Sequence, residues 1–209
     1  MVTYKCTIGN KEEEKIFGYL PKITNELDKL NEKDDFSINT IRQITLWKLD
    51  RYVDISEEVV KKINSLKSSK DCNKEKIKEV LLDLLKTDGV GLPMASTYLR
   101  FRNPQVFQII DARAYRAAFD YTKQKLLLNK DKEELVNIYI KYLDKLREIA
   151  ETGYHGVIVK FKDLDRFLYD KDKEYGFKVN DKYPYNEFNK LIKKYGFAKA
   201  QEKIKVKNK

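Results

Sequence analysis

The sequence predicts an all-α protein made of short amphipathic helices. Apolar residues recur at intervals of three and four, the helical period, along most of the 209 residues. Side chains suited to cap helices precede several of these periodic segments. Strand signals are scarce: the apolar runs at residues 108–110 and 157–159 are short and are equally compatible with extended linkers. We therefore expect a helical fold without a sheet.

Two helices are expected in the first third of the chain. Residues 36–52 carry Ile41 and Ile44 and are typical of a helix, although their periodicity is less regular than elsewhere. Ser56 is a candidate N-cap for a helix over residues 57–66. The inward face of that helix would carry Val59, Val60, Ile63 and Leu66.

The later helices are more regular. Asn73 is a candidate N-cap for a helix whose apolar face consists of Ile77, Val80, Leu81, Leu84 and Leu85. A longer face, repeated over about four turns, consists of Leu135, Ile138, Tyr139, Tyr142, Leu143, Leu146 and Ile149. A charged helix is expected to begin at residues 163–169, and a last one, after Pro184, carries Phe188, Leu191, Ile192 and Tyr195. Loops are expected at residues 67–73, 87–92, 102–108, 123–130 and 152–156.

The length fits one domain composed of two lobes. We expect residues of about 73–122 to form one lobe, with residues 1–72 and 123–209 packed around it. The segment from Lys182 onward carries nine lysines against two glutamates, and we expect the basic tail at about 200–209 to fray.

Composition limits the partners and cofactors. The chain has 43 Lys and Arg against 33 Asp and Glu, a formal net charge of +10, which favours an anionic partner such as nucleic acid but would also serve solubility alone. Cys6 and Cys72 are far apart and are expected to be free thiols. With two cysteines and one histidine, His155, a His/Cys zinc site is not expected, and one chain cannot supply a four-cysteine iron–sulfur cluster.

The most informative segment joins two predicted helices through Gly89, Val90 and Gly91, with Pro93 near the start of the second helix. Glycine permits a positive φ and close approach of another molecule to the backbone. Val90 is expected to point inward, while the amides at the next helix N-terminus face outward, where the helix dipole favours a phosphate oxygen. Such contacts would position DNA without reading its sequence. The alternative is a glycine-containing turn that binds no ligand.

Arginines are concentrated after this hairpin, in a chain whose usual cation is lysine; they are Arg100, Arg102, Arg113 and Arg116. The planar guanidinium suits phosphates and carboxylates, although solvated surface positions would explain the same residues. Among them lie an apolar pair, Ile109 and Ile110, then Asp111, and then a helix expected over residues 112–119.

From about Leu81 to Phe119 the sequence resembles the helix-hairpin-helix superfamily of base-excision DNA glycosylases. In that superfamily a Gly-apolar-Gly hairpin is followed about 20 residues later by an apolar pair, an aspartate and a helix containing arginine. The same order and spacing occur in this chain between Gly91 and Asp111. The resemblance implies a two-lobed, all-α glycosylase fold whose hairpin holds the strand beside a lesion in duplex DNA. DNA contacts are then expected from Gly89, Val90, Gly91, Pro93, Met94, Arg113 and Arg116.

The resemblance also implies that Asp111 is the catalytic carboxylate, facing the cleft that receives the flipped nucleotide. Cleavage of an N-glycosidic bond develops positive charge on the sugar, and a carboxylate can stabilise that charge or activate a water molecule. From the residues alone, Asp111 could instead be the N-cap of the helix over residues 112–119, and the two roles are compatible.

The sequence departs from the superfamily at one position. Members that also cut the DNA backbone carry a lysine 18 residues before the aspartate, where this chain has Pro93. Proline has no amine to form a Schiff base, so the resemblance implies a short, monofunctional member that uses water and leaves an abasic site. The alternatives are a helix-hairpin-helix module that recognises DNA structure or recruits partners without chemistry, and a helical protein-interaction domain.

Trp47 and Arg51 lie four residues apart, on one face of a predicted helix. Resemblance to superfamily relatives with a Trp-Lys-x-x-Arg helix before the hairpin implies that both line the base pocket. A core tryptophan covered by a surface arginine is the alternative. His155 lies in a connector that could approach the cleft or be a simple loop.

Apart from DNA, few partners are expected. No cofactor is expected, although the hairpin could hold a monovalent cation. No apolar run approaches the roughly 18 residues of a membrane span, and the N-terminus lacks a signal-peptide pattern. We therefore expect a monomeric protein without a membrane partner, located in the cytoplasm or, in a prokaryote, at the nucleoid.

Overall fold

The computed structural model describes residues 21–27, 29, 35–49, 53–67, 73–121, 126, 128–174, 184–196, 199–200 and 202–203. Within these ranges the fold is helical and contains no strand, so the all-α prediction is confirmed. The only β-type pairing among the described residues is an isolated antiparallel bridge between Tyr154 and Val157. The chain divides into two compact units, Met1–Asp54 and Ile55–Lys209.

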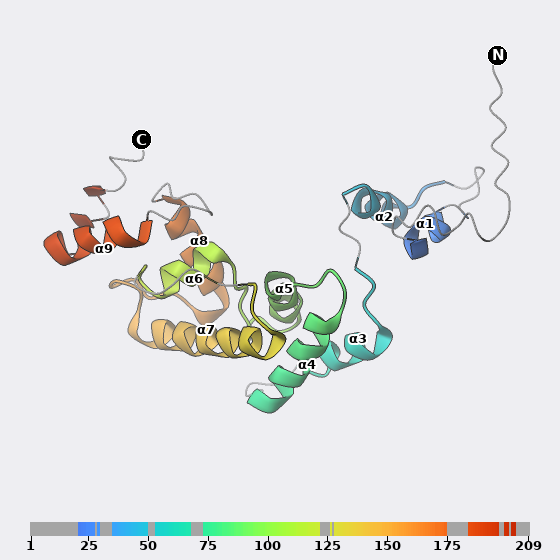
Figure 1. Cartoon of the computed structure of the whole chain (residues 1–209), viewed down its shortest axis with the longest axis horizontal. Coiled ribbons are helices and arrows are strands. Elements are labelled where there is room, and N and C mark those ends of the chain that lie inside the picture. The colour runs from blue at the N-terminus through green and yellow to red at the C-terminus, as the bar shows by residue number, and fades with distance from the viewer. Residues whose placement is uncertain are drawn as a thin grey trace, which may run out of the picture. The chain divides into compact units, whose positions relative to one another are not determined.

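The first unit contains α1 (Pro21–Leu27) and α2 (Ile38–Lys48), which pack against each other (Figure 1). The predicted helix over residues 36–52 is therefore shorter than expected at both ends. Its start is set by Ser37, whose side chain accepts a hydrogen bond from the Thr40 amide and caps the helix.

The second unit contains α3 (Glu57–Asn64), α4 (Lys74–Lys86), α5 (Leu92–Arg102), α6 (Ala112–Ala118), α7 (Lys132–Thr152), a 3-10 turn η2 (Phe161–Asp163), α8 (Leu164–Glu174) and α9 (Pro184–Tyr195). The predicted N-caps Ser56 and Asn73 are confirmed, because their side chains accept the amides at the start of α3 and α4. Asp131 caps α7 in the same way, through the Glu134 amide.

The long helix α7 organises the second unit. It packs along α4 and α6, while α8 packs on α6 and α3 lies against α4 and α5 (Figure 1). Its buried residues are Leu135, Val136, Tyr139, Tyr142, Leu143, Leu146 and Ile149. This face follows the helical period and supplies much of the apolar burial that drives folding.

The expected division into lobes stays a prediction. Helix α7 packs on α4 and α6, and α8 packs on α6. The second compact unit begins at Ile55, well before the expected boundary at about residue 73, and the first unit is formed by residues 1–54 alone. The expected frayed tail at about 200–209 lies largely outside the described residues.

The two candidate strand segments are both linkers. Residues 107–110, between α5 and α6, run without a ladder partner in the described part of the chain. Residues 158–160 likewise join the Tyr154–Val157 bridge to η2 as irregular backbone. The first of these linkers leads directly to Asp111.

A buried ion cluster ties α8 to α6. The Asp172 carboxylate is fully buried and accepts hydrogen bonds from Arg116 Nε at 2.5 Å and Nη2 at 2.6 Å. Arg113 Nη1 donates to the same carboxylate at 2.8 Å. Removing one member of such a cluster leaves a buried charge uncompensated, so the cluster constrains how the two helices pack.

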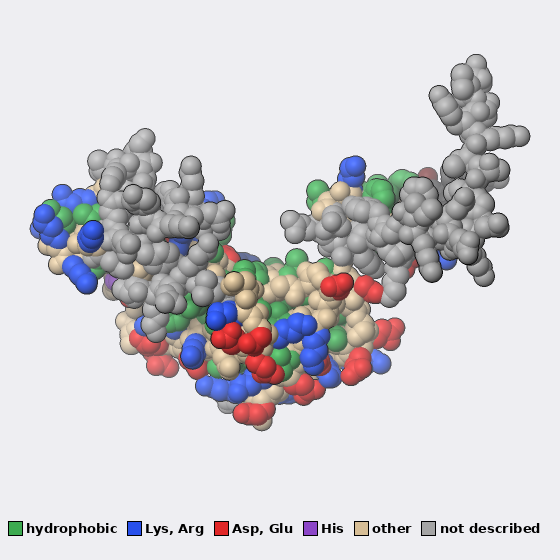
Figure 2. Space-filling model, in the orientation of Figure 1, with side chains coloured by type: hydrophobic (Ala, Val, Ile, Leu, Met, Phe, Trp, Pro, Cys, Tyr) green, Lys and Arg blue, Asp and Glu red, His purple; other side chains and the backbone are tan. Residues whose placement is uncertain are grey.

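Charges on the second unit are mixed where Figure 2 displays them, with basic and acidic side chains interspersed rather than separated. Basic side chains gather over α9, whose last turn carries the exposed Lys193 and Lys194. None of the helices in the described ranges is long and apolar enough to cross a membrane.

Candidate functional site

The hairpin has the conformation that its sequence requires. Gly89 adopts a φ of +76°, in the left-handed region that favours glycine. The Val90 amide donates to the Thr87 carbonyl at 3.1 Å and the Val90 side chain is buried, so the turn is held from inside. Gly91, which is exposed, is the N-cap residue of α5.

The N-terminus of α5 is left without a side-chain cap. Gly91 has no side chain to accept the first amides of the helix, and Pro93 in the first turn has no amide at all. Met94 is exposed beside it. The Leu92 and Met94 amides therefore lie at the positive end of the helix dipole without an acceptor from the cap residue.

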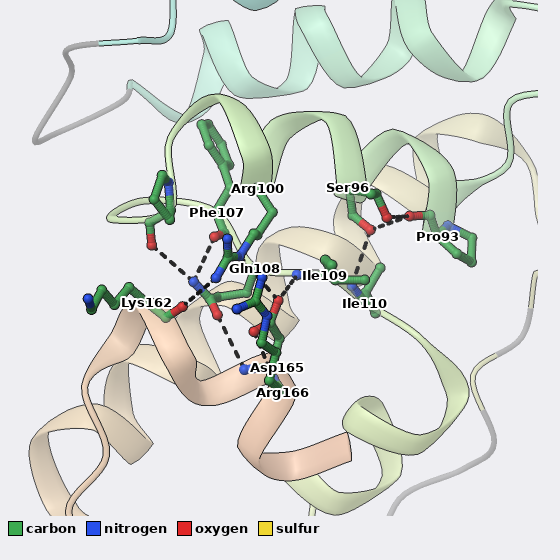
Figure 3. A network of polar contacts seen from close by, with 12 residues as sticks. Pro93, Ser96, Arg100, Phe107, Gln108, Ile109, Ile110, Lys162, Asp165 and Arg166 are labelled. Atoms are coloured by element: carbon green, nitrogen blue, oxygen red, sulfur yellow. Dashed lines mark hydrogen bonds and ion pairs between the residues drawn. The ribbon is translucent and has the colours of Figure 1, made fainter. Parts of the chain in front are cut away.

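A single buried hydroxyl connects the first turn of α5 to the segment that precedes Asp111. Ser96 Oγ donates to the Pro93 carbonyl at 2.8 Å and accepts the Ile110 amide at 3.1 Å (Figure 3). Its side chain is completely buried. Pro93 is thus linked through Ser96 to Ile110, the residue next to Asp111.

The Gln108–Ile109 peptide group is held at both edges by side chains. The Tyr139 hydroxyl, from α7, donates to the Gln108 carbonyl at 2.9 Å. The Asp165 carboxylate, from α8, accepts the Ile109 amide at 3.0 Å (Figure 3). Backbone polar groups that are removed from water need such partners, and here side chains supply what a neighbouring strand would supply in a sheet.

The next peptide group, between Ile109 and Ile110, is held in the same way. The Tyr142 hydroxyl, one turn further along α7, donates to the Ile109 carbonyl at 3.0 Å. Ser96 accepts the Ile110 amide on the opposite edge. We call these two consecutive peptide groups, with their four side-chain partners, the peptide clamp.

Asp165 is itself fixed by several contacts, as Figure 3 shows. Its carboxylate accepts the Arg166 amide at 2.7 Å, and its own amide donates to Gln108 Oε1 at 3.3 Å. Arg100 Nε lies 3.6 Å from Asp165 Oδ2, and Arg100 Nη2 donates to the Lys162 carbonyl at 3.0 Å. Arg100 and Asp165 are both buried, so each compensates the other's charge.

Asp111 follows the peptide clamp and caps α6. One carboxylate oxygen, Oδ1, accepts the amides of Arg113 and Ala114, each at 2.8 Å. The N-cap interpretation of Asp111 is therefore confirmed, and it leaves Oδ2 without a hydrogen bond from any described residue.

Asp111 also lines a cavity of about 370 Å³ together with Ile109, Asp165, Arg166, Tyr169 and Asp170. Burial raises the pKa of the Asp111 carboxyl above its ordinary value of 3.8, because a carboxylate is stabilised less by the protein interior than by water. The two amide hydrogen bonds oppose this rise, and the negative charge of Asp172 adds to it.

The expected DNA-contacting arginines have structural partners. Arg116 is only 2 % exposed and its guanidinium is bound to Asp172, so we no longer count it among the residues that would contact DNA. Arg113 is half-buried, bound to the same carboxylate, and beside Asp111 in the sequence. In this cluster Arg116 binds the Asp172 carboxylate through two nitrogens, and Arg113 binds it through Nη1.

The structure describes two of the remaining candidate residues, Trp47 and His155. Trp47, in the first unit, donates from Nε1 to Thr24 Oγ1 at 2.8 Å and is half-buried, while Arg51 lies outside the described residues. His155 pairs with Asp120 at 2.8 Å in the turn after α7 and does not line the cavity beside Asp111. No group of three or more metal-ligating side chains occurs in the part of the chain that the structure describes.

Comparisons of the chain with protein-family models, with curated proteins and with solved structures found no match.

Four side chains that build the site were not singled out from the sequence. Tyr139 and Tyr142 were expected only as apolar positions of a helix, and Asp165 as part of a charged helix of structural character. Ser96 had no distinguishing signal. The two tyrosines on an otherwise aliphatic buried face were the available clue, because a buried phenol needs an acceptor.

The charge of Asp111 and its role as a helix cap should affect the free energy of unfolding separately. Because the folded-state pKa is raised, the protonated carboxyl contributes stability below about pH 3.8, and this contribution is lost as the pH rises through the raised pKa. Asp111→Asn keeps an acceptor for the cap and removes the charge. We therefore expect the free energy of unfolding of Asp111→Asn, relative to that of the natural protein, to increase as the pH rises from about 3.8 through the raised pKa of Asp111.

Asp111→Ala is the matched control because it removes the same charge together with the cap. It should be less stable than Asp111→Asn by about 1 kcal/mol at every pH. Urea unfolding of the three proteins between pH 3 and pH 8 measures both effects. A natural protein that gains stability over Asp111→Asn with rising pH would contradict the raised pKa.

Proposed function

We propose that the protein binds duplex DNA through the Gly89–Gly91 hairpin and hydrolyses the N-glycosidic bond of a damaged or mispaired base, with Asp111 as the catalytic carboxylate. The observation that carries the proposal is the placement of Asp111. It is a partly buried carboxylate at a cavity, on backbone fixed by side chains and linked through Ser96 to the hairpin helix.

The DNA-binding part of the proposal is supported by the form of the hairpin. Gly89 allows the sharp turn, Val90 anchors it, and Gly91 presents exposed backbone at the uncapped start of α5. A phosphate oxygen suits such a site, because the amides and the helix dipole both favour an anion. Positive charges on the rest of the chain would add a contribution to binding that does not depend on sequence.

The catalytic part is supported by the two oxygens of Asp111. Oδ1 is held by the α6 amides, which fixes the direction of the carboxylate, and Oδ2 remains available at the cavity. As the C–N bond breaks, the base leaves with the electron pair and the sugar becomes positively charged. Asp111 would stabilise that charge and accept a proton from the water that attacks the anomeric carbon.

The absence of an amine at residue 93 supports hydrolysis by water rather than lyase chemistry. A lyase forms a Schiff base between an enzyme amine and the sugar, and Pro93 offers none. The product would therefore be an intact strand with an abasic site. A non-catalytic module that recognises DNA structure is the second candidate, and it is favoured by the cap role that already occupies Asp111 Oδ1.

A panel of lesion-bearing duplexes distinguishes these candidates. We expect base release from at least one duplex, detected as strand breaks that appear only after alkali treatment. Asp111→Asn should lower the rate of release by roughly 10²-fold or more, because a positioned acid–base group contributes about that much. Binding of the same duplex should change little.

Three outcomes would count against this proposal. Full activity in Asp111→Asn would remove Asp111 from the chemistry. Binding of duplexes without base release from any lesion would favour the non-catalytic module. Strand breaks without alkali, trapped by borohydride, would contradict hydrolysis by water and require a lysine from elsewhere in the chain.

The hairpin can be tested by Gly91→Ala. A Cβ at this position would lie 3.8 Å from Pro93 Cδ, an ordinary contact, and the φ of −88° suits alanine, so the protein should fold. The methyl group would occupy the space through which a phosphate approaches the backbone. We expect affinity for duplex DNA to fall about tenfold, which corresponds to about 1.4 kcal/mol.

The matched control for this variant is Gln105→Ala, an exposed position between α5 and α6 that lies outside the hairpin. Fluorescence anisotropy over a range of salt concentrations measures both proteins. Affinity of Gly91→Ala equal to that of the control would show that the hairpin backbone does not meet DNA.

A further inference from the structure

We propose that Tyr142 and Ser96 are positioning residues that set the place of Asp111 by holding opposite edges of the peptide group between Ile109 and Ile110. This inference rests on the proposed catalytic role of Asp111. It assigns a role in the reaction to two side chains that would not touch the DNA.

The geometry gives each of the two residues one edge of the same peptide group. The carbonyl oxygen and the amide hydrogen of a trans peptide point in opposite directions, and the described chain contains no cis peptide bond. Tyr142 donates to the Ile109 oxygen at 3.0 Å, and Ser96 accepts the Ile110 amide at 3.1 Å. Rotation of the peptide plane would break both hydrogen bonds at once.

Both partners are themselves buried in the helical packing. Tyr142 is completely buried on α7, the longest helix. Ser96 is completely buried on α5, and its hydroxyl hydrogen is committed to the Pro93 carbonyl. The Ser96 oxygen can therefore only accept from Ile110, which fixes the direction of the hydrogen bond.

The surroundings of Tyr142 favour the protonated form of its hydroxyl. Burial raises the pKa of the Tyr142 phenol well above 10, and the negative charge of Asp111 raises it further. The phenol therefore stays protonated at neutral pH and keeps its hydrogen for the Ile109 carbonyl. Only Ile110 separates the held peptide group from Asp111.

Tyr139 is the matched control for Tyr142. It lies one turn earlier on the same helix, is also completely buried, and donates at 2.9 Å to the Gln108 carbonyl. Its peptide group is one further from Asp111. The substitutions Tyr142→Phe and Tyr139→Phe each remove one oxygen from the same environment and should lower thermal stability to a similar extent.

The experiment compares single-turnover base release and duplex binding for these variants. We expect Tyr142→Phe and Ser96→Ala to slow base release about tenfold, because small displacements of a catalytic group have effects of this order. Affinity for the lesion duplex should stay the same. Tyr139→Phe should slow base release by less than about threefold, because its effect reaches Asp111 only through a second peptide group.

A second readout does not require activity. The Asp111 carboxyl can be titrated by NMR in protein labelled with carbon-13 at aspartate. Loosening of the Ile109–Ile110 peptide group should admit water and move the pKa of Asp111 down toward 3.8 in Tyr142→Phe and Ser96→Ala, and by less in Tyr139→Phe.

The two readouts separate the inference from the proposed function. If no lesion is processed by the natural protein but the Asp111 pKa moves as expected, the positioning holds and the glycosylase proposal fails. If base is released but Tyr142→Phe and Tyr139→Phe behave alike in rate and in Asp111 pKa, the positioning inference is wrong. A loss of duplex affinity in Tyr142→Phe in place of a slower rate would also overturn it.

Discussion

The peptide clamp is the constraint on which the rest of the candidate site depends. Two consecutive peptide groups have no strand beside them, and each is hydrogen-bonded on both edges by side chains from α5, α7 and α8. A buried backbone group without a partner would cost about 1–3 kcal/mol, so these residues are required by the fold itself. The hydrogen bonds of the clamp therefore restrict rotation of the backbone directly before Asp111, the N-cap residue of α6.

The clamp also explains how distant parts of the second unit act on one carboxylate. Ser96 joins the hairpin helix to the Asp111 segment, α7 contributes the two tyrosines, and α8 contributes Asp165. The buried Asp172 cluster then ties α8 to α6. Burial of the site has a cost, because it raises the pKa of Asp111 and destabilises its charged form. Active sites commonly contain charged groups whose burial lowers the stability of the folded protein.

Much of the architecture could be predicted from the sequence because it depends on local chemistry. The helical period identified α4 and α7, and Ser56 and Asn73 marked helix starts. The hairpin was predicted from its glycines. Asp111 was singled out by the resemblance to the helix-hairpin-helix glycosylases and, as an N-cap, by its place before a predicted helix. The partners of Asp111 were not found, because Asp165 and Tyr142 are distant in sequence and only packing brings them together. The partner of Arg116 was missed for the same reason: an arginine that binds a buried aspartate 56 residues away looks, in sequence, like one that binds phosphate.

Native-state hydrogen exchange measured by NMR tests the clamp most directly, because it reports how often a backbone amide loses its hydrogen bond. The amides of Ile109 and Ile110 lie outside helices, where exchange is ordinarily fast. If the clamp fixes the backbone before Asp111, both amides will exchange as slowly as the core amides of α7, only through global unfolding. Exchange at the rate of the exposed turn residues His155 and Gly156 would contradict a fixed Asp111 and, with it, the account of the site.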